Sequence, residues 1–315
     1  MLRSFALTAV CLLAGCAATP PPRPEASVLA DRIMQLDRTT QWRAVTQTAI
    51  PFDTHHPQGM VRIGDRVFFT SVEIIRPTQR HPQPIEGMDR DAGEGRGHLF
   101  LIGADGALKA DLPLGEGDIY HPGGLDFDGS WLWVPVAEYR PNSRSIIYRV
   151  NPSTREVFEA FRVPDHIGAI AVDREGRALI GVSWGGSRIY RWPLQPDGSV
   201  APADLTTPPI SRARSHYISW QDCHGLDGRM MACTGLANYS LPGAGSSFSL
   251  GGVELMDLSD FRPLLQTPIL LWSPSGRSML QNPAWFEATD DGLRAWFMPD
   301  DDQSVLYTYE SASPG

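Results

Sequence analysis

Apolar residues in this chain occur in short runs of strand character, and five pairs of these runs flank a turn pair such as Gly64-Asp65 or Asp128-Gly129. β-Branched and aromatic residues are frequent in the runs, and Asp-Gly-type pairs are typical of tight turns. The pairs of runs are 60–63 with 66–72, 125–127 with 131–136, 169–172 with 178–183, 223–226 with 230–235, and 285–288 with 293–297. Each pair predicts a β-hairpin.

A short polar motif opens every one of these hairpins. The motifs are His56-Pro-Gln-Gly59, His121-Pro-Gly-Gly124, Asp165-His-Ile-Gly168, Asp222-Cys-His-Gly225 and Asn282-Pro-Ala-Trp285. A third apolar run follows each hairpin, at 98–102, 145–150, 188–192, 252–256 and 305–309, and outer strands such as 156–160 come next. The motifs start 44 to 65 residues apart, and such a recurrence of four-stranded units is typical of β-propeller blades.

The fifth unit ends after three strands, and residues 42–49, ahead of the first motif, can supply its fourth strand. The sequence thus predicts an all-β fold, a single β-propeller of five blades closed by an N-terminal strand. Six blades are the alternative if the longest interval hides a degenerate blade, whereas a β-sandwich predicts no fivefold recurrence. We also expect a short helix at 27–36 and long polar loops at 77–97 and 238–251.

Composition agrees with a turn-rich β fold. The 315 residues include 30 glycines and 27 prolines, above the average usage of roughly 7% and 5%. The formal net charge of −9 and the lack of a basic run argue against nucleic acid as a partner. We expect a monomer without a nucleotide cofactor.

The N-terminus carries the pattern of an export signal. Arg3 precedes an apolar stretch at 5–13 that is too short to span a bilayer stably. The following Leu13-Ala14-Gly15-Cys16 resembles the lipobox of bacterial lipoproteins, which implies lipidation of Cys16, and Ala17 after it implies an outer-membrane location facing the periplasm or the cell exterior. An ordinary secretory signal with a chance cysteine is the alternative. The expected divisions are a signal peptide (1–15), a Pro-rich tether (16–27) and the propeller domain (28–315).

Two cysteines, Cys223 and Cys233, remain as the thiols of the exported chain, because Cys11 leaves with the signal and Cys16 carries lipid. In an oxidising compartment such a pair is expected to be oxidised. The two cysteines flank Asp227-Gly228 and lie at equal distances from a three-residue turn there, so they face each other on neighbouring strands. The sequence therefore predicts a cross-strand disulfide; a metal-binding pair is the alternative, although no CxxC spacing supports it.

Propeller geometry places the start of each inner strand at one mouth of the central channel, and the second strand returns to that mouth. The motif starts therefore predict a ring of polar residues, with two histidines just beyond it. The ring consists of His56, His121, Asp165, Asp222 and Asn282, with His166 and His224 beside it. The returning strands end 16 to 18 residues after their ring positions, at Glu73, Glu138, Asn238 and Asp300.

Three interpretations of this ring remain open. Imidazole and carboxylate donors suit Zn²⁺ or Fe²⁺, while carboxylates with asparagine oxygens suit Ca²⁺ or Mg²⁺. A carboxylate beside an ordered imidazole is alternatively an acid–base pair, and the polar groups would otherwise only satisfy loops and channel water. Glu73 and Glu138 recur in similar strand ends, Val72-Glu73-Ile-Ile-Arg76 and Ala137-Glu138-Tyr-Arg140, which makes them the candidate catalytic bases.

The lipobox, the His-Pro-x-Gly repeat and the Asp-Gly hairpins together resemble a family of exported bacterial β-propeller lipoproteins of unassigned function. More remotely, the polar channel resembles gluconolactonase and senescence-marker-type propellers, which implies metal-dependent hydrolysis of a lactone or ester. Those propellers have six blades and a Glu/Asn/Asn/Asp metal set, to which Glu73, Asn238, Asn282 and Asp300 would correspond. His56 and His121 depart from that pattern, so the metal and the reaction stay undetermined.

Two functions follow from these observations. The first is an outer-membrane-anchored propeller with a metal-assisted hydrolase or lyase site at the channel mouth, where a divalent metal activates water or polarises a carbonyl. The second is a non-catalytic propeller whose channel mouth binds an envelope protein or a glycan.

Overall fold

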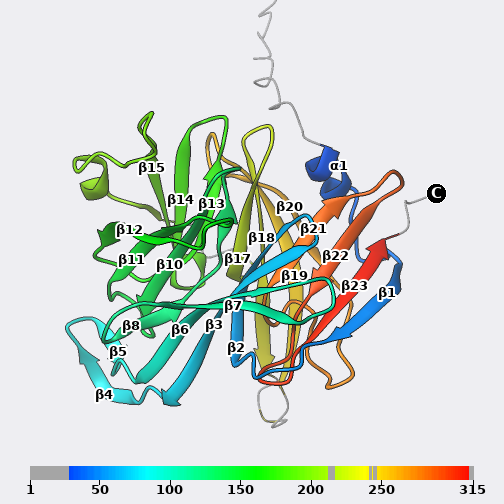
Figure 1. Ribbon diagram of the computed structural model, residues 1–315, viewed down its shortest axis with the longest axis horizontal. Coiled ribbons are helices and arrows are strands. Elements are labelled where there is room, and N and C mark those ends of the chain that lie inside the picture. The colour runs from blue at the N-terminus through cyan, green and yellow to red at the C-terminus, as the bar shows by residue number, and fades with distance from the viewer. Residues whose placement is uncertain (1–27, 212–216, 241–242, 244–246, 312–315) are drawn as a thin grey trace, which may run out of the picture.

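The computed structural model describes residues 28–211, 217–240, 243 and 247–311, and its strands form five antiparallel sheets arranged as the blades of one propeller (Figure 1). The all-β fold and the five blades predicted from the sequence are confirmed. The predicted signal peptide, Cys16 and the tether lie outside the described residues. Within the described ranges, no helix is long and apolar enough to cross a membrane.

Blades 1 and 2 contain the first two predicted hairpins. From the axis outward, blade 1 consists of β2 (His56–Ile63), β3 (Arg66–Arg76), β6 (Glu94–Ile102) and β7 (Leu108–Leu114). Blade 2 consists of β8 (Ile119–Pro122) and β9 (Asp126–Phe127), then β10 (Leu132–Glu138), β11 (Ser145–Val150) and β12 (Val157–Val163). The inner strand of blade 2 is interrupted where it approaches blade 3, because Gly124 exchanges backbone hydrogen bonds with Gly168 and Ile170.

Blades 3 and 4 continue around the axis. Blade 3 consists of β13 (Ile167–Asp173), β14 (Ala178–Ser183), β15 (Arg188–Pro193) and β16 (Ile210–Ser211), with short 3₁₀ helices at Trp184–Gly186 and Asp204–Thr206. Blade 4 consists of β17 (Ser219–Leu226), β18 (Met230–Ser240), β19 (Ser247–Asp257) and β20 (Pro263–Pro268). Inner strands such as β13 and β14 are buried along nearly their whole length because neighbouring blades cover both of their faces.

Blade 5 joins the two ends of the chain. It consists of β21 (Ala284–Ala288), β22 (Leu293–Phe297), β23 (Val305–Ser311) and, outermost, β1 (Trp42–Ala49). β1 pairs antiparallel with β23 from Trp42 opposite Ser311 to Ala49 opposite Val305, so the predicted closing strand is confirmed. The expected short helix is α1 (Val28–Met34), whose buried Ala30 and Ile33 pack against blades 4 and 5.

The two segments expected to be polar loops are largely strands. β3 and β6 extend into residues 77–97 from both sides, and the remainder forms a hairpin of β4 (Arg80–Ile85) and β5 (Met88–Arg90). Likewise, β18 and β19 run through most of 238–251. These extensions are mostly solvent-exposed, so backbone hydrogen bonds stabilise them without an apolar pattern that would reveal them in the sequence.

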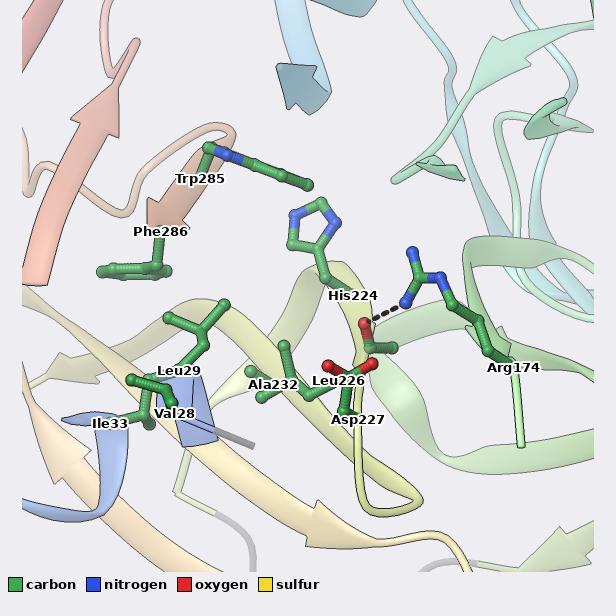
Figure 2. Close-up of a pocket in the computed structure, with 11 residues that line it drawn as sticks. Val28, Leu29, Ile33, Arg174, His224, Leu226, Asp227, Ala232, Trp285 and Phe286 are labelled. Atoms are coloured by element: carbon green, nitrogen blue, oxygen red, sulfur yellow. Dashed lines mark hydrogen bonds between the residues drawn. The ribbon is translucent and has the colours of Figure 1, made fainter. Parts of the chain in front are cut away.

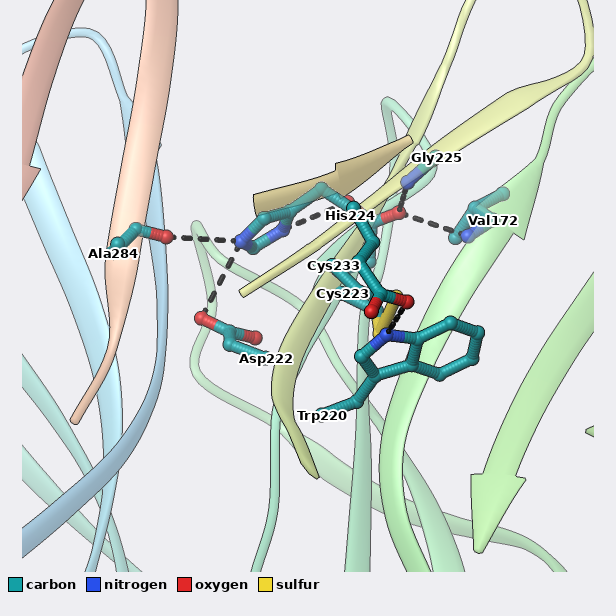
Figure 3. Close-up of a disulfide and its surroundings, with 10 residues drawn as sticks. Val172, Trp220, Asp222, Cys223, His224, Gly225, Cys233 and Ala284 are labelled. Atoms are coloured by element: carbon teal, nitrogen blue, oxygen red, sulfur yellow. Dashed lines mark hydrogen bonds and ion pairs between the residues drawn. A yellow bond between two sulfur atoms is a disulfide. The ribbon is translucent and has the colours of Figure 1, made fainter. Parts of the chain in front are cut away.

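A disulfide joins Cys223 on β17 to Cys233 on β18 (Figure 3). The two residues are direct partners in the strand pairing, as the turn position predicts. Both side chains are buried in the apolar core between blades 3 and 4. The predicted cross-strand bridge is therefore confirmed.

Candidate functional site

A cavity of about 500 Å³ opens at the mouth of the channel where the inner strands begin. We call it the histidine cavity because three of the predicted ring histidines line it. Its wall contains His56, Gln58, His121, Tyr139, His166, Gly168, Trp184, Gly185, Ser219, Trp220, Gln221, Leu236, Asn238 and Gln281. The structure thus brings together four of the predicted site residues, His56, His121, His166 and Asn238.

His56 forms a pair with Asp301, a residue the sequence analysis did not select. Its Nδ1 lies 2.7 Å from Asp301 Oδ1, and Arg277 and Asn282 also donate to that carboxylate. Burial alone would raise the pKa of Asp301, but the hydrogen bonds from His56, Arg277 and Asn282 lower it to about 2. Because an ionised carboxylate only accepts, His56 Nδ1 carries the hydrogen and Nε2 is free for proton transfer.

His166 is fixed in one orientation by the backbone of blade 2. Its Nδ1 lies 2.8 Å from the carbonyl oxygen of Glu138, so Nδ1 is the protonated nitrogen. Burial lowers the pKa of His166 to about 4, and the ring packs edge-on against Trp184 with centroids 4.7 Å apart. His166 Nε2 lies on the side of Gly168, which also lines the cavity. At neutral pH this nitrogen is a hydrogen-bond acceptor.

His121 is buried but makes no side-chain hydrogen bond with a described residue. Neither Nδ1 nor Nε2 has a partner, and the ring stacks on Tyr139 with centroids 4.1 Å apart. Burial, with His166 and His56 nearby, holds the pKa of His121 well below its usual value. Since buried polar atoms are rarely left unpaired, a molecule in the cavity is the natural partner for His121.

Amide side chains complete the polar wall. Gln221 Nε2 donates to Gln58 Oε1 at 2.7 Å, while the buried Nε2 of Gln58 has no partner among the described residues. Asn238 accepts a hydrogen bond from Ser249. Gln58 therefore presents an N–H donor beside the neutral imidazoles.

Two of the predicted acidic residues brace the blades instead of lining the cavity. The carboxylate of Glu138 is buried and accepts hydrogen bonds from Arg140 and Arg144. Asp165 pairs with Arg188, 2.6 Å away, and accepts a further hydrogen bond from Tyr190. With these partners, both carboxylates neutralise arginines.

Asp222 and His224 lie deeper in the channel than the histidine cavity. His224 Nε2 lies 3.3 Å from Asp222 Oδ2 and 3.2 Å from the carbonyl oxygen of Ala284 (Figure 3). Asp222 Oδ2 also accepts from the backbone N–H of Met60. Burial alone would lower the pKa of His224, but Asp222 and Asp126 raise it to about 10. This charged pair joins blades 1, 4 and 5 at the axis.

The remaining predicted residues are separated from one another. Asn282 is buried and donates to Asp301 and to the backbone of Pro299. Asp300 accepts hydrogen bonds from Ser273 and Ser275. Glu73 lies in blade 1 with His55 and His98, and the donor atoms of these three side chains lie within 4.8 Å of one another.

A second cavity, of about 320 Å³, lies at the other end of the inner strands. Figure 2 shows apolar side chains of α1 at this cavity, with Phe286 and Trp285 beside His224. Its polar groups are engaged within the protein, since Arg174 donates to the backbone of Gly225 at 2.9 Å and His224 pairs with Asp222. We therefore assign the candidate site to the histidine cavity.

Acidification is expected to destabilise the protein as the buried histidines become charged. The pKa of His166 is about 4 in the folded protein against 6.5 for an ordinary histidine, so the unfolded chain binds the proton first. The stabilising contribution of neutral His166 is present above pH 6.5 and is lost as the pH falls toward 4, which amounts to about 2 kcal/mol between pH 7 and 5. Urea unfolding at both pH values tests this, and His166→Gln is expected to lose less stability over the interval. An equal loss in the variant would contradict the assignment.

Comparisons with known proteins place the chain in a family but give no activity. A protein-family model described as "Family of unknown function (DUF6454)" matches residues 16–313. None of the curated proteins matches the chain. Among solved structures, a hypothetical protein from Leishmania major is 11% identical, with a TM-score of 0.50 and coverage of 86% of this chain and 91% of its own. The Neurospora crassa Pan2 WD40 domain is 9% identical, with a TM-score of 0.44 and coverage of 89% and 98%. Such likenesses concern the fold alone.

Proposed function

Because the chain belongs to the DUF6454 family, whose function is unknown, we propose an activity from the site itself. The protein is a propeller hydrolase or lyase whose histidine cavity binds a small, uncharged polar molecule such as a lactone or an ester. The observation that carries this proposal is the His56–Asp301 pair at the edge of a cavity with two further neutral histidines. A base oriented by a buried carboxylate is the arrangement that general-base catalysis needs.

In this proposal His56 moves the proton. Its Nε2 removes a proton from water, the oxygen of that water attacks the carbonyl carbon, and the leaving oxygen then takes the proton from His56 as its bond to carbon breaks. Asp301 keeps the imidazole in the required tautomer and stabilises its protonated form. The unpaired Nε2 of Gln58 is the candidate donor to the oxygen that becomes negative in the transition state.

The other groups of the cavity account for the choice of an uncharged substrate. His121 and His166 are neutral at pH 7 because burial lowers the pKa of both, so they form hydrogen bonds with hydroxyl or carbonyl groups. Tyr139 and Trp184 supply flat apolar faces, with ring centroids 5.8 Å apart. Such a wall suits a compact, ring-shaped molecule.

The described geometry favours proton transfer over a metal held by the three cavity histidines. Among the described residues, the group whose ligand atoms lie within 4.8 Å of one another is His55, Glu73 and His98. His121 and His166 have ring centroids 6.0 Å apart. The proposed reaction therefore uses His56 and Asp301 without a metal step.

The proposal includes a location at the cell envelope. The lipobox-like segment ending in Cys16 suggests lipid anchoring at the outer membrane. The disulfide between Cys223 and Cys233 supports an oxidising compartment, because such bonds are rare in the cytosol.

A hydrolysis screen on aliphatic lactones and aryl esters tests the proposed activity. His56→Ala is expected to lower kcat/KM by about 10²- to 10⁴-fold, since it removes the general base. Asp301→Asn is expected to lower kcat in the same direction, because it weakens the orientation of His56. The matched control is His81→Ala, which removes a histidine from the β4–β5 hairpin outside the cavity.

Two outcomes would contradict this proposal. Turnover that persists unchanged in His56→Ala would remove His56 from the reaction. Saturable binding of small polar molecules without turnover of any lactone or ester would favour the non-catalytic alternative, a binding propeller for an envelope ligand.

A further inference from the structure

We propose that His55, Glu73 and His98 bind one divalent transition-metal ion on blade 1, outside the histidine cavity. The donor atoms of the three side chains lie within 4.8 Å of one another. Two imidazoles and one carboxylate form a donor set that Zn²⁺ accepts readily, with a fourth position left for water. This site is independent of the proposed reaction at His56.

The strand register of blade 1 brings the three residues together. His56 is paired with Val72 across β2 and β3, so His55 precedes the pair and Glu73 follows it. On the other side of β3, His98 of β6 is opposite Ser71, two residues before Glu73. Residues two apart on a strand share a face, so Glu73 and His98 are diagonal neighbours on one side of the sheet.

His98 has the arrangement typical of a metal ligand. Its Nδ1 lies 2.9 Å from Asp111 Oδ1, and its Nε2 is buried without a partner among the described residues. The ring stacks on Phe100 with centroids 5.0 Å apart and planes 4° apart. A carboxylate that holds one nitrogen while the other remains free is the common outer-shell arrangement of metal-bound histidine.

His55 and Glu73 show how the site is assembled. His55 has a φ of 56°, a conformation uncommon outside glycine, and its ring centroid lies 5.2 Å from that of His98. Glu73 Oε2 accepts a hydrogen bond from Arg96 at 2.8 Å, which leaves Oε1 for the metal. All three side chains are partly exposed, so an ion can enter from solvent.

Metal binding here would act on the neighbouring catalytic candidate through the backbone. His55 and His56 are consecutive, and they contribute to different sites. A metal that holds His55 restrains the start of β2, and with it the position of His56. We infer that the site is a clamp on this strand and does not take part in chemistry.

Titration with Zn²⁺ tests the site directly, without a substrate. After dialysis against a chelator, the full described domain is expected to bind one equivalent of Zn²⁺ by calorimetry, and Co²⁺ is expected to give visible absorption typical of tetrahedral coordination. Glu73→Gln and His98→Gln keep the side-chain size and are each expected to weaken Zn²⁺ binding at least 10-fold. Asp111→Asn, which removes only the partner of His98, is expected to weaken it about 10-fold.

Controls separate this site from the histidine cavity. His56→Ala and His81→Ala are expected to retain one equivalent of Zn²⁺, and circular dichroism shows whether each variant is folded. The proposal is overturned if the wild-type protein binds no stoichiometric Zn²⁺, or if a folded His98→Gln protein binds it as tightly as the wild type. Loss of the ion in His56→Ala with retention in His98→Gln would place the metal in the histidine cavity instead.

Discussion

Replacing Gly225 by alanine is expected to lower the free energy of unfolding by about 4 kcal/mol or more, and to prevent folding in a marginally stable preparation. A Cβ atom at this position would lie 1.8 Å from the carbonyl oxygen of Val172 and 2.6 Å from its carbonyl carbon. Both are backbone atoms of the inner strand β13, so neither can move aside as a side chain can. The inner strands of blades 3 and 4 would have to separate.

The same repeat position in blade 3 supplies a matched control. At Gly168 the nearest atoms to an added Cβ lie 3.7 Å away, which is ordinary van der Waals contact. Gly168→Ala is therefore expected to change stability by less than about 1 kcal/mol. Urea denaturation of both variants, followed by tryptophan fluorescence, measures the difference. Similar stabilities of the two variants would show that the close approach of β17 to β13 does not constrain the fold.

Removal of Asp222 is the second large effect we expect. Asp222→Ala leaves the charged ring of His224 and the backbone N–H of Met60 without this carboxylate at the buried axis. Breaking a buried ion pair in this way typically costs about 3–5 kcal/mol. The loss is expected at pH 7 and shrinks as the pH rises toward 10. This sign follows because Asp222 and Asp126 raise the pKa of His224 to about 10, so the pair's stabilising contribution is complete below pH 6.5 and disappears at high pH.

A surface carboxylate provides the comparison for Asp222. Glu310 pairs with Arg294 and Arg43 at the outer strands of blade 5, where both arginines are largely exposed. Glu310→Gln is expected to cost at most about 1 kcal/mol. Chemical unfolding at pH 7 and pH 9.5 distinguishes the two variants. A loss below 1 kcal/mol for Asp222→Ala at pH 7 would show that the axis pair does not hold the blades together.

The sequence predicted the architecture well because the propeller repeats its own pattern. Apolar strands, Asp-Gly turns and a polar motif recur in every blade, and the closing strand and the disulfide follow from the count of strands and from the turn at Asp227. The outer extensions of β3, β6, β18 and β19 were missed because polar, exposed strands have no apolar alternation. Backbone pairing alone defines them.

The site was predicted less completely because β-bulges change which side chains face the channel. A register shift between Ala137 and Glu138 turns the strand, so Tyr139 lines the cavity while Glu138 meets two arginines. Constant spacing along the chain cannot reveal such a shift. Asp301 was missed by one position within an acidic run, for which spacing pointed to Asp300. Only the three-dimensional structure shows which of these acids meets His56.

The pairing of β1 with β23 has a consequence for how the molecule is made. Strands that pair across more than 250 residues form late, because the intervening chain must be ordered first. During synthesis β1 is made near the start, and its partner comes only at the end. Throughout that interval blade 5 lacks its outer strand, and β1 has an unpaired edge that can join strands of other chains. The risk of aggregation is therefore concentrated in the last step of assembly, when the two ends of the polypeptide meet.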